Sequence, residues 1–129
     1  MIPMSSENQK KLVILQTSGL DTPYRLPSPF FIATAAAAME MEAIMVFTAK
    51  GCGILKKGEA EKVLIKKGGK SIAYFLNLAL DAGVKFYYCQ PGLELMDMSA
   101  DELIKEVAGV IGAAAFVDMV QEADIVLTF

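Results

Sequence analysis

Short apolar runs alternate with helix-like segments along most of this chain, and that alternation restricts the fold more than any other feature of the sequence. The runs are rich in β-branched and aromatic residues, which favours buried strands. Strands that alternate with helices predict an α/β fold with a parallel sheet of about five strands and right-handed crossovers. The predicted strands cover residues 11–17, 42–48, 84–88, 107–111 and 125–129, and the predicted helices cover residues 28–39, 71–82, 99–106 and 112–122.

Local signals set the ends of these helices. Ser28 is a candidate N-cap, and Pro29 suits the first helical position because it has no N–H to donate. Gly83 is a stop signal for the helix before it. Ser99 and Glu102 have the spacing of a capping box, so a helix is expected to run from there to about residue 106.

Length and composition limit the classes of function. A chain of 129 residues is expected to form one domain, with residues 1–10 as a loose tail. Its apolar content of 54% is high, which predicts a deeply buried sheet, a subunit interface or both. The net charge of −3 gives no reason to expect a nucleic acid partner.

The absence of histidine removes the commonest general base and most transition-metal sites, so no metal is expected. The longest apolar run is too short to span a bilayer, and the amino end does not resemble a signal peptide. A cytoplasmic location is therefore expected, with both cysteines as free thiols.

Cys89 is the first candidate for chemistry. It follows the apolar run 84–88, and Gln90, Pro91 and Gly92 form a predicted turn after it. A thiol at the carboxyl end of a parallel strand lies where ligands collect in open α/β sheets. A buried cysteine that acts only as a small apolar residue remains an equal alternative.

Cys52 lies between Gly51 and Gly53, at the end of another predicted strand. The two glycines are expected to leave its thiol with little cover, and an incidental loop cysteine is the favoured interpretation. A disulfide with Cys89 is conceivable if the two strands are near neighbours, but the sequence cannot establish the close approach of the Cα atoms.

The segment 56–70 is rich in lysine and punctuated by glycine, and is expected to be a mobile excursion over the strand ends. Its lysines would steer an anionic ligand or an acidic partner, although a solvated face is the commoner explanation.

Residues 84–90, followed by residues 92–96, resemble the cysteine segment of the DsrE/DsrF-like family, and especially its DsrE-type branch. Residues 47–57 resemble that branch's second strand and loop, and residues 123–129 resemble its last strand. The resemblance thus covers nearly the whole chain. Bulky residues are common in the branch where Cys52 stands, so Cys52 is not carried over. The peroxiredoxin label that this branch often carries does not fit the residues around Cys89.

The resemblance implies a flavodoxin-like, three-layer fold and a homo-oligomer, either a trimer or a hexamer. It also implies a sulfur-trafficking role in which Cys89 carries a sulfane sulfur or thiosulfonate group between partners such as a rhodanese or a TusA-like carrier. Such a protein is a carrier rather than a turnover enzyme, and it needs no cofactor. The loop around Cys89 and the lysine-rich segment would stabilise the added negative charge.

Two other hypotheses stay open. The chain could be a non-catalytic oligomeric module that binds a ligand at the strand ends. It could also be a dithiol redox protein that uses Cys52 and Cys89.

Overall fold

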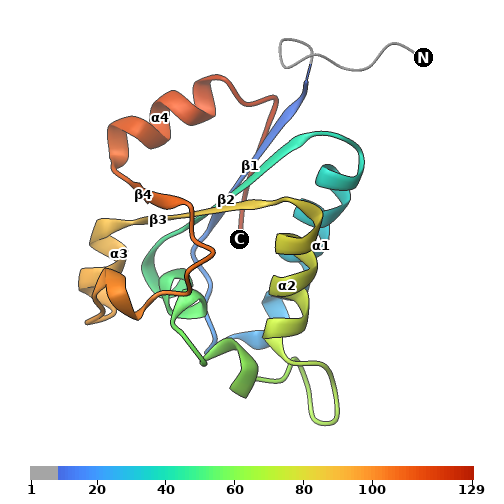
Figure 1. Cartoon of the computed structure of the whole chain (residues 1–129), viewed down its shortest axis with the longest axis vertical. Helices are drawn as coiled ribbons and strands as arrows, with labels where there is room; N and C mark the ends of the chain where they lie inside the picture. Colours follow the sequence, from blue (N-terminus) through green and yellow to red (C-terminus); the bar gives the residue numbers. More distant parts are fainter. Residues whose placement is uncertain (1–8) are drawn as a thin grey trace.

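The fold is a five-stranded parallel sheet with helices on both faces, as seen in a computed structural model that describes residues 9–129 (Figure 1). The strand order is β4-β3-β2-β1-β5, and every pairing is parallel. The predicted α/β fold is confirmed, while residues 1–8 of the expected tail lie outside the described part. The strands are β1 (Lys11–Gln16), β2 (Glu42–Phe47), β3 (Lys85–Cys89), β4 (Gly109–Ile111) and β5 (Ile125–Thr128).

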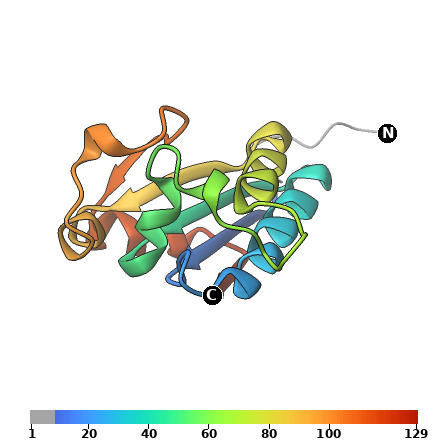
Figure 2. The same cartoon turned by 90° about the horizontal axis from the view of Figure 1, so that it is seen from below.

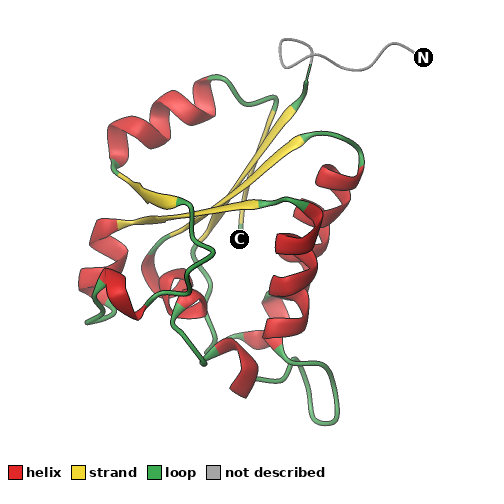
Figure 3. Ribbon diagram, in the orientation of Figure 1, coloured by secondary structure: helices red, strands yellow, loops and turns green. Residues whose placement is uncertain are grey.

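The helices lie on the two faces of the sheet (Figure 3). Helices α1 and α2 pack side by side on one face, and α4 lies on the other (Figures 1 and 2). The short α3 directly follows β3. The helices are α1 (Pro27–Ala38), α2 (Ile72–Ala82), α3 (Gln90–Leu95) and α4 (Ala113–Gln121). No helix in the described range 9–129 combines the length and the apolar character needed to cross a membrane.

Alternation along the strands divides the core into two clusters, because successive side chains of a strand point to opposite faces. Ile14 and Phe86 belong to the larger cluster under α1 and α2, whereas Val13 and Val46 belong to the smaller one under α4. The larger cluster is built around three fully buried rings. Phe86 lies 5.1 Å from Phe47 and 6.1 Å from Phe30 between ring centroids.

Three of the predicted helices, α1, α2 and α4, begin and end within one residue of the expected positions. Helix α2 starts after Ser71 and ends before Gly83, whose φ of 98° is the left-handed conformation that favours glycine at this position. Helix α1 starts at Pro27, one residue before Ser28, and its N-cap is Leu26. The expectation that Ser28 caps α1 is therefore wrong.

The helix expected over residues 99–106 is also wrong. The capping box forms, with the Ser99 N–H donating to the Glu102 carboxylate at 3.2 Å, but only one 3-10 turn follows, Ala100–Glu102. The chain then becomes extended because Leu103 is buried and its neighbours bond to the segment after β2. Ile104 donates its N–H to the Leu55 carbonyl at 2.9 Å, and Lys57 donates to the Glu102 carbonyl at 2.9 Å.

The lysine-rich segment 56–70, which we expected to be a mobile excursion, forms a series of hydrogen-bonded turns. It contains the 3-10 turn Ala60–Lys62 and then a tight loop at the start of α2. Ile65 donates its N–H to the Lys70 carbonyl at 2.9 Å, and Ile72 donates to the Val63 carbonyl at 2.8 Å. These bonds close the loop at the lower right of Figure 1.

Candidate functional site

Cys89 is the last residue of β3 and the N-cap of α3. The strand ends there because Pro91 has no N–H for a further ladder bond, yet proline is well accepted in the first turn of a helix. The sequence alone predicted a turn at this point, so α3 was missed. Cys89 pairs with Ile111 of β4, and its half-buried side chain packs with the smaller cluster on the α4 side.

Gly92 allows α3 to lie close against the segment that follows β2 (Figure 2). A Cβ atom at this position would lie 2.5 Å from the Cys52 Sγ and 3.0 Å from the Ala49 backbone nitrogen. Only a residue without a side chain fits there, because a real Cβ does not approach other heavy atoms this closely. Gly92 was predicted as part of the loop around Cys89, and the close packing of α3 against Cys52 is the physical reason for a glycine at this position.

Cys52 is fully buried, and the expectation of a poorly covered thiol is wrong. The residues Ala49–Leu55 form a 3-10 helix that turns the thiol inward, toward the larger core cluster. Its Sγ lies 3.4 Å from the Phe47 carbonyl oxygen and 4.0 Å from the Cys89 carbonyl oxygen. Burial, with a smaller effect of nearby Cys89, raises the pKa of the Cys52 thiol to about 11. Cys52 is therefore protonated and a poor nucleophile near neutral pH.

The two thiols are free and lie on opposite faces of the sheet. Cys89 belongs to the cluster under α4, whereas Cys52 belongs to the cluster under α1 and α2. They are nevertheless neighbours, because the Cys52 Sγ lies 4.0 Å from the Cys89 carbonyl oxygen. The burial and the raised pKa of the Cys52 thiol weigh against the dithiol hypothesis.

The other predicted site residues have distinct places. A Cβ at Gly51 would come 2.2 Å from the Gln16 carbonyl oxygen. Glycine at this position therefore allows the segment after β2 to pack directly on the end of β1. Gly53 faces the end of the Met96 side chain, and a Cβ at this position would lie 3.2 Å from the Met96 Cε. Gln90 is exposed in the first turn of α3. The structure places Gly92 of α3 directly against Cys52, and Gly51 and Gly53 flank Cys52 in the 3-10 helix Ala49–Leu55.

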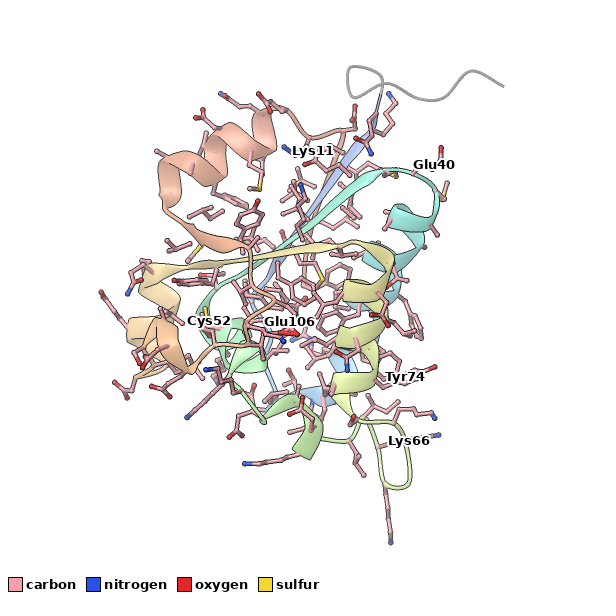
Figure 4. All side chains as sticks on the ribbon, viewed as in Figure 1. Lys11, Glu40, Cys52, Lys66, Tyr74 and Glu106 are labelled. Carbon is pink, nitrogen blue, oxygen red and sulfur yellow. The ribbon has the colours of Figure 1, made fainter. Side chains whose placement is uncertain are left out.

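The lysines do not converge on Cys89 as a group. Lys66 and Cys52 lie on opposite sides of the molecule in Figure 4, which places the tip of the lysine-rich segment away from the end of β2. Lys56 instead pairs with Glu102 at 3.4 Å, and Lys50 pairs with Asp21 at 2.8 Å. Sequence reasoning overlooked Lys50, although its place just before Gly51, after a predicted strand, was the available signal.

The family follows from a comparison of the amino-acid sequence with known families and proteins. The model of the DsrE/DsrF-like family matches residues 10–129. The chain belongs to this family. It is 31% identical to the sulfur carrier protein DsrE2 of Allochromatium vinosum, in a match that covers 92% of this chain and 98% of that protein.

Two solved structures support the fold. The ychN protein from E. coli superposes with a TM-score of 0.72 at 19% identity, covering 94% of this chain and 99% of that one. The protein MTH1491 from Methanobacterium thermoautotrophicum superposes with a TM-score of 0.64 at 16% identity, covering 94% and 99%. The predicted DsrE/DsrF-like resemblance is confirmed by the family match over residues 10–129.

Proposed function

We propose that this protein is a sulfur carrier in which Cys89 transiently holds a sulfane sulfur. Membership of the DsrE/DsrF-like family and the match to a protein named as a sulfur carrier support a role in sulfur trafficking. The observation that carries the assignment to Cys89 is the difference between the two thiols. Cys89 is only half buried at the carboxyl end of β3, whereas Cys52 is completely enclosed.

The proposed transfer needs only thiol chemistry. The Cys89 thiolate attacks the terminal sulfur of a donor persulfide, a new S–S bond forms on Cys89, and the S–S bond of the donor breaks to release its thiolate. A thiolate of the acceptor then attacks the terminal sulfur on Cys89 in the same way. Electrons balance in both steps, so no cofactor or external oxidant is required. A rhodanese or a TusA-like carrier is a donor or acceptor of the suitable class.

The test is the intact mass of the reduced protein after incubation with polysulfide. The wild type is expected to gain one or more sulfur atoms on a single site, and reductant should remove them. Cys89→Ser should lose the adduct completely, because an alkoxide does not form at Ser under these conditions. Cys52→Ala is the matched control and should keep it, since Cys52 is buried and protonated.

Two results would contradict this proposal. A stoichiometric adduct on Cys89→Ser would exclude Cys89 as the carrier. A loss of two hydrogens that requires both cysteines would instead support the dithiol hypothesis.

A homo-oligomer is part of the proposal, supported by exposed apolar side chains on the α4 side of the sheet. Helix α4 has no buried residue, and β5 is an edge strand. Val117 of α4 is 51% exposed, and Val126 of β5 is 45% exposed. Val126 pairs with Val13, whose side chain belongs to the cluster under α4. The Val126 side chain therefore lies on the same face of the sheet as α4, which carries Val117. Apolar surface that remains open in one copy is typical of an interface.

Light scattering on the eluting protein tests the homo-oligomer. The wild type is expected at a multiple of 13.9 kDa, and the double variant Val117→Lys and Val126→Lys should shift to smaller species. Tyr24→Lys changes a more exposed apolar residue outside this face and should leave the mass unchanged. If the wild-type protein has the mass of a single chain at a concentration on the order of tens of micromolar, the prediction is wrong.

A further inference from the structure

A pocket of about 340 Å³ opens at the carboxyl edge of the sheet, and Cys89 does not line it. Leu20 comes from the loop after β1, Gly53 from the segment after β2, and Met96 from the segment after α3. Loops that follow three neighbouring parallel strands therefore meet around one cavity. In open α/β sheets, this edge is where ligands bind.

The pocket has an apolar interior. Leu20, Met96 and Met98 supply its apolar side chains, and both methionines are only partly exposed and pack on the larger core cluster. Methionine side chains adapt to ligands of irregular shape because they are flexible and polarizable. The interior therefore favours an aliphatic or thioether group over a strongly hydrated one.

The rim of the pocket carries charges of both signs. Lys50 and Lys56 supply two positive charges, and Asp21 and Glu59 supply two negative ones. Lys50 and Asp21 face each other at 2.8 Å in an exposed ion pair, which holds the pKa of the Asp21 carboxyl below its usual value. Lys56 pairs with Glu102, and Glu59 pairs with Lys62, each at 3.4 Å in a partly exposed ion pair. Pairs of this kind contribute little to stability, so a ligand can replace them at small cost.

We propose that this pocket binds small zwitterions with an apolar body, of amino acid to dipeptide size. The carboxylate of such a molecule would meet Lys50 or Lys56, its ammonium group would meet Asp21 or Glu59, and its side chains would cover the methionines. A simple anion would face both carboxylates, and a simple cation would face both lysines. The balanced rim therefore selects a molecule that carries both charges, and the volume lies within the range of small-molecule sites.

This inference is independent of the sulfur chemistry proposed for Cys89. The pocket and the thiol are nevertheless linked through one element, because α3 begins just after Cys89 and ends just before Met96. A bound molecule would thus contact the segment that follows the helix, without touching the reacting sulfur.

The test uses the dipeptide leucyl-leucine, which has no thiol, in an NMR titration of the full chain. Saturable shifts are expected at the Gly53 amide and at the Met96 and Met98 methyl groups, with a dissociation constant of about 1 mM. The N-acetylated dipeptide lacks the ammonium group, and the dipeptide amide lacks the carboxylate. Each is expected to bind about tenfold more weakly.

Two variants make the titration specific. Gly53→Leu should fill the pocket and abolish the shifts, because Gly53 lines the pocket and a Cβ there meets only the movable end of Met96. Gly112→Leu is the matched control, since a Cβ there has open space around it, and it should bind as the wild type does. The double variant Lys50→Met and Lys56→Met removes both rim lysines, and it should weaken binding of the zwitterion about as much as blocking the carboxylate does. This variant keeps the test available if Gly53→Leu does not fold.

Three outcomes would overturn the inference. The first is the absence of saturable shifts at the pocket residues. The second is equal binding of the zwitterion and its two blocked forms, which would leave a nonspecific apolar surface. The third is unchanged binding by a folded Gly53→Leu variant, which would place the ligand elsewhere.

Discussion

Replacing Phe86 by alanine is expected to lower the free energy of unfolding by about 3–5 kcal/mol. Phe86 is fully buried in β3, and its ring packs against those of Phe47 and Phe30, with centroids 5.1 and 6.1 Å away. Alanine would lose the free energy gained by burying the ring. It would also leave a cavity that the neighbouring side chains, held in place on β2 and α1, cannot fill. Urea unfolding followed by circular dichroism measures the change.

Phe31→Ala is the matched control for this prediction. Phe31 is 51% exposed on α1 and contacts Phe75 edge-to-face at 5.2 Å, so the same substitution should cost only about 1 kcal/mol. Phe86→Leu keeps most of the apolar volume and should fall between the two. Equal losses for Phe86→Ala and Phe31→Ala would show that the three-ring cluster does not stabilise the fold.

Gly92→Ala is expected to lower the free energy of unfolding by about 1–3 kcal/mol, although alanine is the better helix former. The new Cβ would lie 2.5 Å from the Cys52 Sγ and 3.0 Å from the Ala49 nitrogen, so α3 must move outward. Because Cys89 caps α3, this movement should also change the rate at which Cys89 reacts with a thiol reagent. Urea unfolding and the labelling rate are the two measurements.

A double-mutant cycle separates the clash from other effects of the substitution. Removing the sulfur in Cys52→Ala should restore part of the stability lost in Gly92→Ala, because the shortest contact disappears while the contact with Ala49 remains. Gly112→Ala adds a Cβ in open space and should be nearly neutral. If the effects of Cys52→Ala and Gly92→Ala simply add, the packing of Cys52 against α3 has no energetic role.

The strands and the long helices were predictable because their signals are local. Short apolar runs rich in β-branched or aromatic residues mark β1, β2 and β3, and each strand begins and ends within one residue of the predicted bounds. Helix α2 was predicted well because its apolar spacing and the terminal Gly83 both lie within the segment itself. The position of Cys89 at a strand end followed from the same local pattern.

The failures concern residues whose conformation depends on distant contacts. The capping box at Ser99 formed as expected, but bonds from Ile104 to Leu55 and from Lys57 to Glu102 replaced the helix after one turn. Similarly, the glycines beside Cys52 suggested an exposed thiol, whereas the packing of α3 on the segment after β2 enclosed it.

The sequence by itself determined the parallel α/β fold, the family and the strand end that carries Cys89, because periodicity and motifs are written in neighbouring residues. Only the tertiary structure decided which thiol is enclosed, on which face each one lies, and that Leu20, Gly53 and Met96 share a pocket. Those properties arise where segments far apart in the chain meet. A local pattern contains no information on how closely they pack.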